Sequence, residues 1–147
     1  KTQGSDTRPE RTAFAVKLGA EGAWSPGQDR GIHDAAFVCT PVEAAAVSAL
    51  EAVRPGGTVV LFAHTKEKDP LTFNAGDLCR NDKTLMGSYS ASRTAHEESS
   101  GLVFGGKIRL SALVSHRFPL GKTPEALALA MAPPEGALKI MVETVDA

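Results

Sequence analysis

Residues 52–64, AVRPGGTVVLFAH, decide the fold of this chain. Pro55 cannot continue a helix, and Gly56 and Gly57 can adopt the positive φ angles that a sharp turn needs. Residues 58–63 then form an unbroken apolar and β-branched run, which predicts a strand buried on both faces. A helix that ends directly before such a strand is half of a parallel βαβ unit, so the sequence predicts an α/β fold.

The residues ahead of this stretch complete the unit. Residues 35–39, AAFVC, predict a second strand that is buried on both faces. Pro41 fits the first turn of a helix, whose apolar positions continue through residues 44–53 into the Pro-Gly-Gly turn. We therefore expect a strand, a helix and a strand across residues 35–63.

Weaker patterns predict the elements on either side of this unit. Thr7 and Gly19 are typical of the start and the end of a helix, and Ala23 and Trp24 indicate a short strand after it. Further along, the sequence predicts an extended piece at 71–74, a helical turn at 75–80, a strand at 83–88, a helix at 92–104, an extended segment at 110–118, a helix at 123–131 and a strand at 137–145.

The composition is that of an ordinary globular protein. The 147 residues are 42% hydrophobic and 22% charged, and the net charge of -1 gives no electrostatic reason to expect nucleic acid as a partner. No apolar run approaches the roughly 20 residues needed to span a bilayer, so we expect no membrane partner and a cytoplasmic location. Cys39 and Cys79 lack disulfide or metal-binding spacing and are expected to be buried free thiols.

Several stretches, taken in order, resemble one enzyme family. They are Asp6 with PER and KLGAE, then PVEAAAVSALEAVRPGGTVVLF, KTLMGSYSAS and LVSHRFPL, and finally PEAL with GALKIMVE. Together they resemble the C-terminal half of a zinc-dependent medium-chain alcohol dehydrogenase, especially of the sorbitol and threonine dehydrogenase-like branch. The resemblance implies a Rossmann-type, doubly wound parallel sheet with the dinucleotide across the carboxyl ends of its strands.

Two parts of that family are not found in these 147 residues. The first strand with its G-x-G-x-x-G turn would precede Lys1, and so would the catalytic domain that supplies the zinc ligands. Because the missing strand is central in the family, we expect a partial Rossmann sheet made of two flanks, with the gap filled by a longer protein or by another chain. The resemblance implies an incomplete dinucleotide-binding domain at 1–108 and, at 109–147, a segment that packs with the catalytic domain.

The resemblance also implies where the adenosine half of the cofactor binds. Asp6 stands where the family's acidic residue accepts hydrogen bonds from the ribose, and Arg11 stands where a basic residue flanks it. A carboxylate repels a 2′-phosphate, which favours NAD over NADP. Two alternatives stay open, because Asp6 could simply cap the helix and Arg8 or Arg11 could accept a 2′-phosphate.

Further cofactor contacts follow from the resemblance. Cys39 and Thr40 would pack against the ribose and adenine, although an inert core thiol is the alternative for Cys39. Backbone groups at two strand ends would hold the nicotinamide carboxamide, and a lysine on the last strand would reach the pyrophosphate unless it is merely solvated. These residues are Leu61, Phe62, Ala63, Ser88, Tyr89, Ser90 and Lys139.

The histidines give no indication of a metal or acid–base site. His33, His64, His96 and His116 share no ligand spacing and no neighbouring pair of carboxylates. We therefore expect surface or capping histidines and assign no catalytic residue and no zinc ligand to this chain. His116 lies in SHRFPL, which is a structural element in the family.

Three functional hypotheses follow. The first is the cofactor-binding portion of an NAD-dependent, zinc-dependent dehydrogenase of a small alcohol or polyol, inactive as this chain alone, in which residues 71–74 pair across a homodimer. The second is a non-catalytic dinucleotide-binding or dimerisation module. The third is a class I methyltransferase-like domain, in which a helix, RPGG and a strand also occur in succession, but it leaves SHRFPL and GALKIMVE unexplained.

Overall fold

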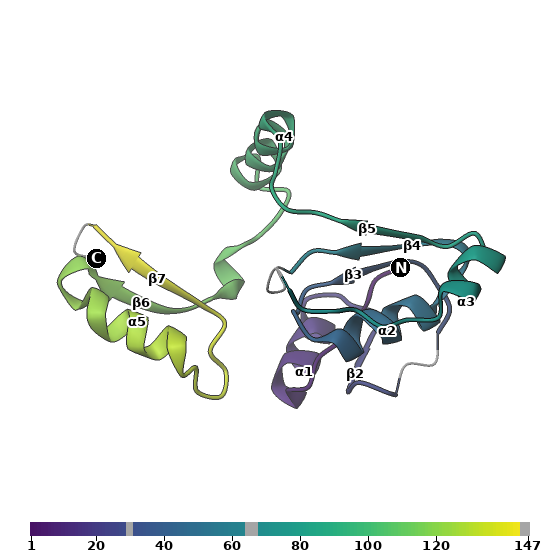
Figure 1. The fold of residues 1–147 in the computed structure, drawn as a ribbon. Helices are drawn as coiled ribbons and strands as arrows, with labels where there is room; N and C mark the ends of the chain where they lie inside the picture. The colour runs from purple at the N-terminus through teal and green to yellow at the C-terminus, as the bar shows by residue number, and fades with distance from the viewer. Residues whose placement is uncertain (29–30, 64–67, 145–147) are drawn as a thin grey trace. The chain divides into compact units, whose positions relative to one another are not determined.

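The βαβ unit predicted around the Pro-Gly-Gly stretch is present in the computed structural model of the chain. β3 (His33–Val38), α2 (Glu43–Ala52) and β4 (Val53–Leu61) follow one another, and the two strands pair in parallel (Figure 1). Val42 is the N-cap of α2, so Pro41 precedes the first turn of the helix instead of opening it.

The structure describes residues 1–28, 31–63 and 68–144. The chain divides into two units, Lys1–Ser90 and Ala91–Ala147. The sequence predicts another division, at residue 108, between the dinucleotide-binding domain and the segment that packs with the catalytic domain. That division stays a prediction.

β5 (Thr84–Gly87) completes a three-stranded parallel sheet in the order β3-β4-β5. In this order the strand after the Pro-Gly-Gly turn lies between the strands predicted at 35–39 and 83–88. Paired residues share a face of a sheet, so the register defines two rows of side chains. One row is Ala36, Val59 and Leu85, and the other is Phe37, Val60 and Met86.

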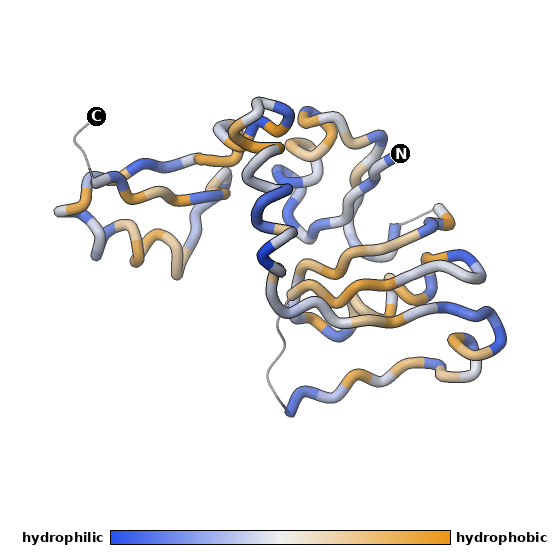
Figure 2. The backbone as a smooth tube through the Cα atoms, turned by 90° about the horizontal axis from the view of Figure 1, so that it is seen from above, coloured by the Kyte–Doolittle hydropathy of each residue, from blue (hydrophilic) through white to orange (hydrophobic). Residues whose placement is uncertain are grey.

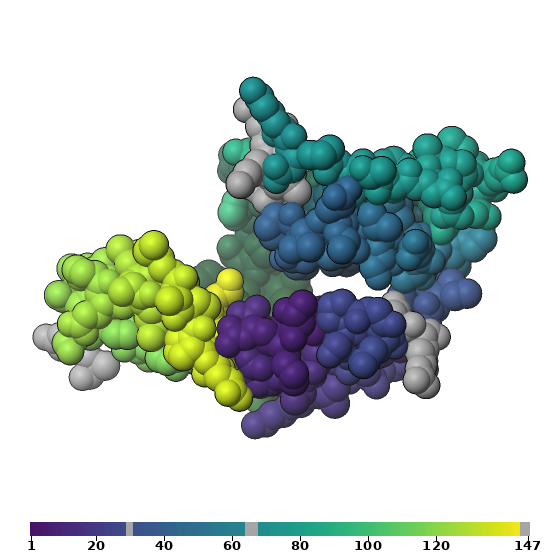
Figure 3. Space-filling model, turned by 60° about the horizontal axis from the view of Figure 1, so that its bottom comes forward, coloured from purple at the N-terminus to yellow at the C-terminus, as the bar shows by residue number. Residues whose placement is uncertain are grey.

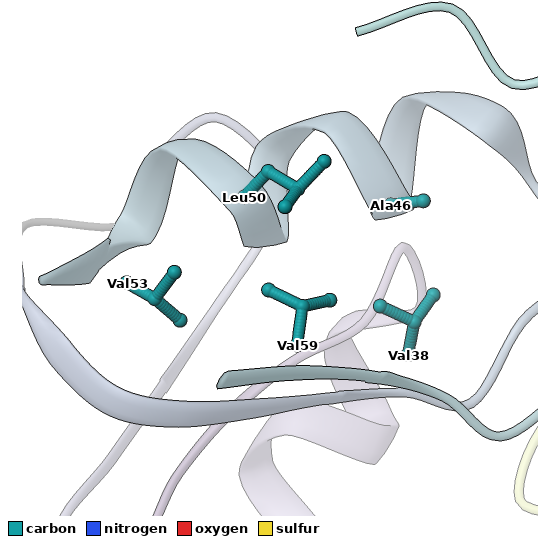
Figure 4. Packing of buried hydrophobic residues seen from close by; sticks show 5 residues of the cluster. All are labelled: Val38, Ala46, Leu50, Val53 and Val59. Atoms are coloured by element: carbon teal, nitrogen blue, oxygen red, sulfur yellow. The ribbon is translucent and has the colours of Figure 1, made fainter. Parts of the chain in front are cut away.

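α2 covers only one face of this sheet. Leu50 and Ala46 of the helix point toward the strands, where Val59 and Val38 meet them (Figure 4). Val59 is fully buried, whereas Phe37 on the other face is 68% exposed. The prediction that β3 and β4 are buried on both faces is therefore wrong, because α2 packs on one side, and in the opposite row the described residues leave Phe37 and Met86 exposed and Val60 half-buried.

The first residues of the chain form a second, smaller parallel pair. β1 (Gln3–Ser5) pairs with β2 (Gly22–Trp24), and α1 (Pro9–Lys17) connects them. The helix has Arg8 as its N-cap, one residue later than predicted, because Pro9 takes the first helical position. Gly19 follows the helix with a φ of +108°, the left-handed conformation in which glycine commonly ends helices.

The two sheets of the first unit are not joined. Among the described residues, no ladder of hydrogen bonds connects β1 or β2 with β3, β4 or β5. Figure 3 shows an opening between the purple and blue residues of the smaller sheet and the blue to teal residues of the larger one. The expected partial sheet, with two flanks and no middle strand, is therefore confirmed.

The Pro-Gly-Gly turn lies within β4 as a bulge. Val53 pairs with His33, and the next paired residue of β4 is Thr58, so residues 54–57 leave the ladder. Gly56 has a φ of +72°, and a Cβ at Gly57 would lie 2.8 Å from the carbonyl oxygen of Arg54. Both glycines are thus required by the backbone path, one for its conformation and the other for lack of space.

Residues 68–82 lead from β4 to β5. α3 (Ala75–Arg80) forms as predicted, and the Asn74 side chain caps it by accepting a hydrogen bond from the Asp77 N–H. The piece at 71–74 forms no strand. Its residues Leu71 and Phe73 pack against the core of the first unit, so pairing across a dimer stays a prediction.

Lys83 connects two helices of the first unit. Its side chain is only 6% exposed, and its Nζ donates to the Leu50 carbonyl at 2.7 Å and to the Asp77 carboxylate at 2.8 Å. The Leu50 carbonyl belongs to the last turn of α2, where carbonyl groups lack helical partners. The hydrogen bond from Lys83 is the main reason why the pKa of Asp77 lies below its ordinary value.

Lys83→Met is expected to destabilise the first unit near neutral pH and to reduce its acid sensitivity. A carboxyl group with a lowered pKa stabilises the fold fully above its unfolded value of 3.8, and this contribution is lost as the pH falls through the lower folded value. The difference in unfolding free energy between the two proteins should therefore shrink below about pH 4. Urea unfolding across this range measures it.

Asp34 provides an internal control for this comparison. Its pKa is also lowered, by the hydrogen bond from Arg54, and this pair is untouched by the substitution. Both proteins should therefore keep the acid-dependent loss that comes from Asp34. A difference between them that stays constant with pH would show that Asp77 does not depend on Lys83.

The second unit begins with α4 (Arg93–Phe104). Ser92 caps it by accepting a hydrogen bond from the Ala95 N–H, and Gly105 follows its end, as predicted. The 3₁₀ turn Ser111–Leu113 then leads into β6.

A small parallel βαβ arrangement forms the rest of this unit. β6 (Val114–Pro119) pairs with β7 (Lys139–Glu143), and the 3₁₀ turn Leu120–Lys122 and α5 (Thr123–Met131) connect them. Ser115 Oγ donates to the Lys139 carbonyl and accepts from the Leu138 N–H, which ties the two strands together.

Figure 2 shows hydrophobic colour along strands and hydrophilic colour in many of the turns.

Both cysteines are free, but they are exposed, and the prediction of buried thiols is wrong. Cys39 follows β3, an edge strand of its sheet, and Cys79 lies on α3, which buries none of its residues fully. None of the described helices is long and apolar enough to cross a membrane.

Candidate functional site

Asp6 fixes the turn from β1 into α1. Its N–H donates to the Trp24 carbonyl at 3.2 Å, which holds Asp6 beside the end of β2. Its Oδ1 accepts a hydrogen bond from the Arg8 N–H at 2.9 Å. Because Arg8 is the N-cap of α1 and its own side chain makes no capping bond, Asp6 takes part in the start of the helix. The capping alternative thus has support, and it uses only one carboxylate oxygen.

Two ion pairs surround this turn. Arg11 Nη1 lies 3.6 Å from Asp6 Oδ2, and Arg8 Nε donates to Glu10 Oε1 at 2.6 Å. The side chains of Arg8 and Glu10 are 29% and 27% exposed, so water reaches this second pair only in part. Sequence reasoning missed Glu10, since an acidic residue in the first turn of a helix is common for dipole reasons alone.

The same corner holds unpaired donors. Arg11 Nε and Trp24 Nε1 are buried, and neither has a hydrogen-bond partner among the described residues. A buried donor without an acceptor costs about 1–3 kcal/mol. Because the chain itself covers both nitrogens, they are not open to a bound ligand in this conformation.

The carboxyl ends of β3, β4 and β5 bring together most of the other predicted site residues. Parallel strands end at one edge of a sheet, and these strands are in parallel register. Cys39 and Thr40 follow β3, Leu61 is the last residue of β4 with residues 62 and 63 after it, and residues 88–90 follow β5. The three strands lie side by side in the order β3-β4-β5 (Figure 1), so their carboxyl ends lie at one edge.

Backbone hydrogen bonds shape this edge. The Val38 carbonyl accepts from both Phe62 N–H and Ala63 N–H at 3.0 Å, and the Leu61 carbonyl accepts from Ser88 N–H at 3.0 Å. Since those N–H groups already donate within the sheet, a carboxamide bound here would meet carbonyl oxygens or side chains instead. Two exposed aromatic side chains belong to the residues that follow β4 and β5. Phe62 is 58% exposed and Tyr89 is 85% exposed.

Lys139 belongs to the other unit. It is the first residue of β7, it is exposed, and its carbonyl accepts the hydrogen bond from Ser115 Oγ. The other predicted site residues thus belong to the first unit, whereas Lys139 belongs to the second.

A zinc site does not fit the residues that the structure describes. They contain no group of three or more His, Cys, Asp or Glu side chains that could hold a metal ion. His33, His96 and His116 lie in β3, α4 and β6, and His64 lies outside the described residues. No step of a reaction is therefore assigned to a metal held by them.

Comparison with known proteins gives three relevant similarities. Residues 1–104 match the family model of the zinc-binding dehydrogenases. The L-arabinitol 4-dehydrogenase of Hypocrea jecorina is 31% identical over 108 residues, which are 74% of this chain and 28% of that enzyme. The L-arabinitol 4-dehydrogenase of Talaromyces emersonii is 33% identical over 107 residues, 73% of this chain and 27% of that enzyme. The chain thus spans less than a third of the curated relatives that it matches.

Solved structures show the same fold. A Sinorhizobium meliloti protein assigned to the zinc-binding dehydrogenases, bound to NADP, gives a TM-score of 0.83 at 19% identity, covering 95% of this chain and 44% of that one. A short chain alcohol dehydrogenase from Escherichia coli CFT073, complexed with NADH, gives 0.79 at 16% identity, covering 95% and 43%. These likenesses concern the fold, which is an α/β fold with Rossmann-type parallel sheets.

The family follows from the match of its model. That match extends over residues 1–104, from the first residue to the end of α4, and so covers both sheets of the first unit. The two curated relatives can be aligned with about three quarters of the chain, which agrees with the family match. The chain belongs to the zinc-binding dehydrogenase family.

Proposed function

We propose that this chain is the cofactor-binding portion of an NAD-dependent dehydrogenase of a small alcohol or polyol. The observation that carries the proposal is the Asp6 carboxylate at the carboxyl end of β1, in a member of the zinc-binding dehydrogenases. A carboxylate in this position can accept hydrogen bonds from ribose hydroxyls. A polyol is favoured as substrate of the whole enzyme because the relatives in two fungi are named L-arabinitol 4-dehydrogenases.

Each part of the first unit has a role in this proposal. Asp6 and Arg11 hold the adenosine ribose, while Cys39 and Thr40 pack against it. The strand ends at 61–63 and 88–90 hold the nicotinamide, which accepts a hydride when the cofactor is bound. Lys139 reaches the pyrophosphate. Zinc and its ligands are assigned to protein outside the described residues.

The charges at Asp6 support NAD over NADP. Structures with this fold hold either cofactor, as the NADP and NADH complexes illustrate, so the fold itself does not decide. Around Asp6 the two arginines are balanced by two carboxylates. A 2′-phosphate would enter beside the Asp6 carboxylate without a net positive charge to attract it.

The alternatives differ in their support. The family match disfavours the methyltransferase-like domain, whose only basis is the helix, RPGG and strand. A non-catalytic binding or dimerisation module remains an outcome of the test below. A homo-oligomer and a cytoplasmic location belong to the proposal as well, on the grounds given by the sequence.

The purified 147-residue chain is expected to form no NADH from NAD and small alcohols or polyols. The reason is that its described residues hold no group able to bind zinc and leave the sheet open between β1 and β3. NADH fluorescence after addition of L-arabinitol measures this. Alcohol-dependent formation of NADH would contradict the proposal. A stable dimer on sizing with no NAD binding in calorimetry would favour the non-catalytic module.

A further inference from the structure

We draw no further inference here: the strongest candidate, the extended segment at residues 71–74, whose Thr72 N–H donates to Oε1 of Glu43 in α2 at 2.7 Å, restates the contact across a dimer that the family resemblance already implies.

Discussion

Gly57→Ala is expected to lower the melting temperature of the first unit by roughly 10 °C or more. A Cβ at this position would lie 2.8 Å from the Arg54 carbonyl oxygen, 2.9 Å from the Val53 Cβ and 3.1 Å from the Asp34 carbonyl oxygen. Two of these atoms are backbone, and they cannot move without disturbing the pairing of β3 with β4. Overpacking of this kind costs about 1–3 kcal/mol.

Gly87→Ala is the matched control for this prediction. Gly87 lies in β5 of the same sheet, and a Cβ there would have no neighbour within 4 Å. We expect its melting temperature to stay close to that of the unaltered chain. Thermal unfolding followed by circular dichroism measures all three proteins. Equal stability of Gly57→Ala and Gly87→Ala would show that the bulge at residues 54–57 tolerates a side chain.

A strand–turn–helix segment joined ahead of Lys1 is expected to raise the melting temperature of the first unit. The rise should exceed the fall caused by Gly57→Ala. Two strand edges are open toward the gap, since β1 pairs only with β2, and β3 pairs only with β4, among the described residues. A parallel strand between them would supply hydrogen-bond partners to both edges. The segment would therefore turn two small sheets into one.

The helix of that segment would also cover the exposed face. Crossovers between parallel strands are right-handed, so helices lie on opposite faces when the chain moves in opposite directions across the sheet. The step from a middle strand to β1 runs opposite to the step from β3 to β4, which α2 makes. The added helix therefore lies on the face that carries Phe37, which is 68% exposed.

Burial of Phe37 alone should contribute about 2 kcal/mol, or roughly 10 °C in the melting temperature. The control is the same pair of proteins, extended and unextended, with Phe37→Ala. In this pair the extension should raise the melting temperature by less. Thermal unfolding of the extended and unextended chains measures the effect. An unchanged melting temperature after extension would show that the gap between β1 and β3 does not accept a strand.

The order of elements could be predicted because local patterns determine it. Proline and glycine at residues 55–57 keep α2 from continuing and form the bulge within β4, and Ser92 and Gly105 mark the ends of α4. The exposure of Phe37 could not be predicted. An unbroken apolar run indicates a covered strand, but whether anything covers it depends on residues far away in the chain or outside it.

The candidate site was predictable only in part. Asp6 and the three strand ends were predicted from the resemblance to the zinc-dependent medium-chain alcohol dehydrogenases. The strand ends lie together because parallel strands present their carboxyl ends at one edge. The pair of Arg8 and Glu10 was not predictable, because a guanidinium can turn toward several neighbours and the sequence does not say which. The hydrogen bonds from Phe62 and Ala63 to the Val38 carbonyl likewise depend on how closely two strand ends approach.

The most direct test of a dinucleotide site is the binding of NADH to the extended protein. Trp24 is the one tryptophan of the chain, and its carbonyl contacts Asp6, so its fluorescence reports on a cofactor bound there, provided that the added segment has no tryptophan. We predict saturable energy transfer from Trp24 to NADH that weakens in Asp6→Ala and is poorer with NADPH. An extended protein with a raised melting temperature but no response to NADH or NADPH would contradict the proposed function.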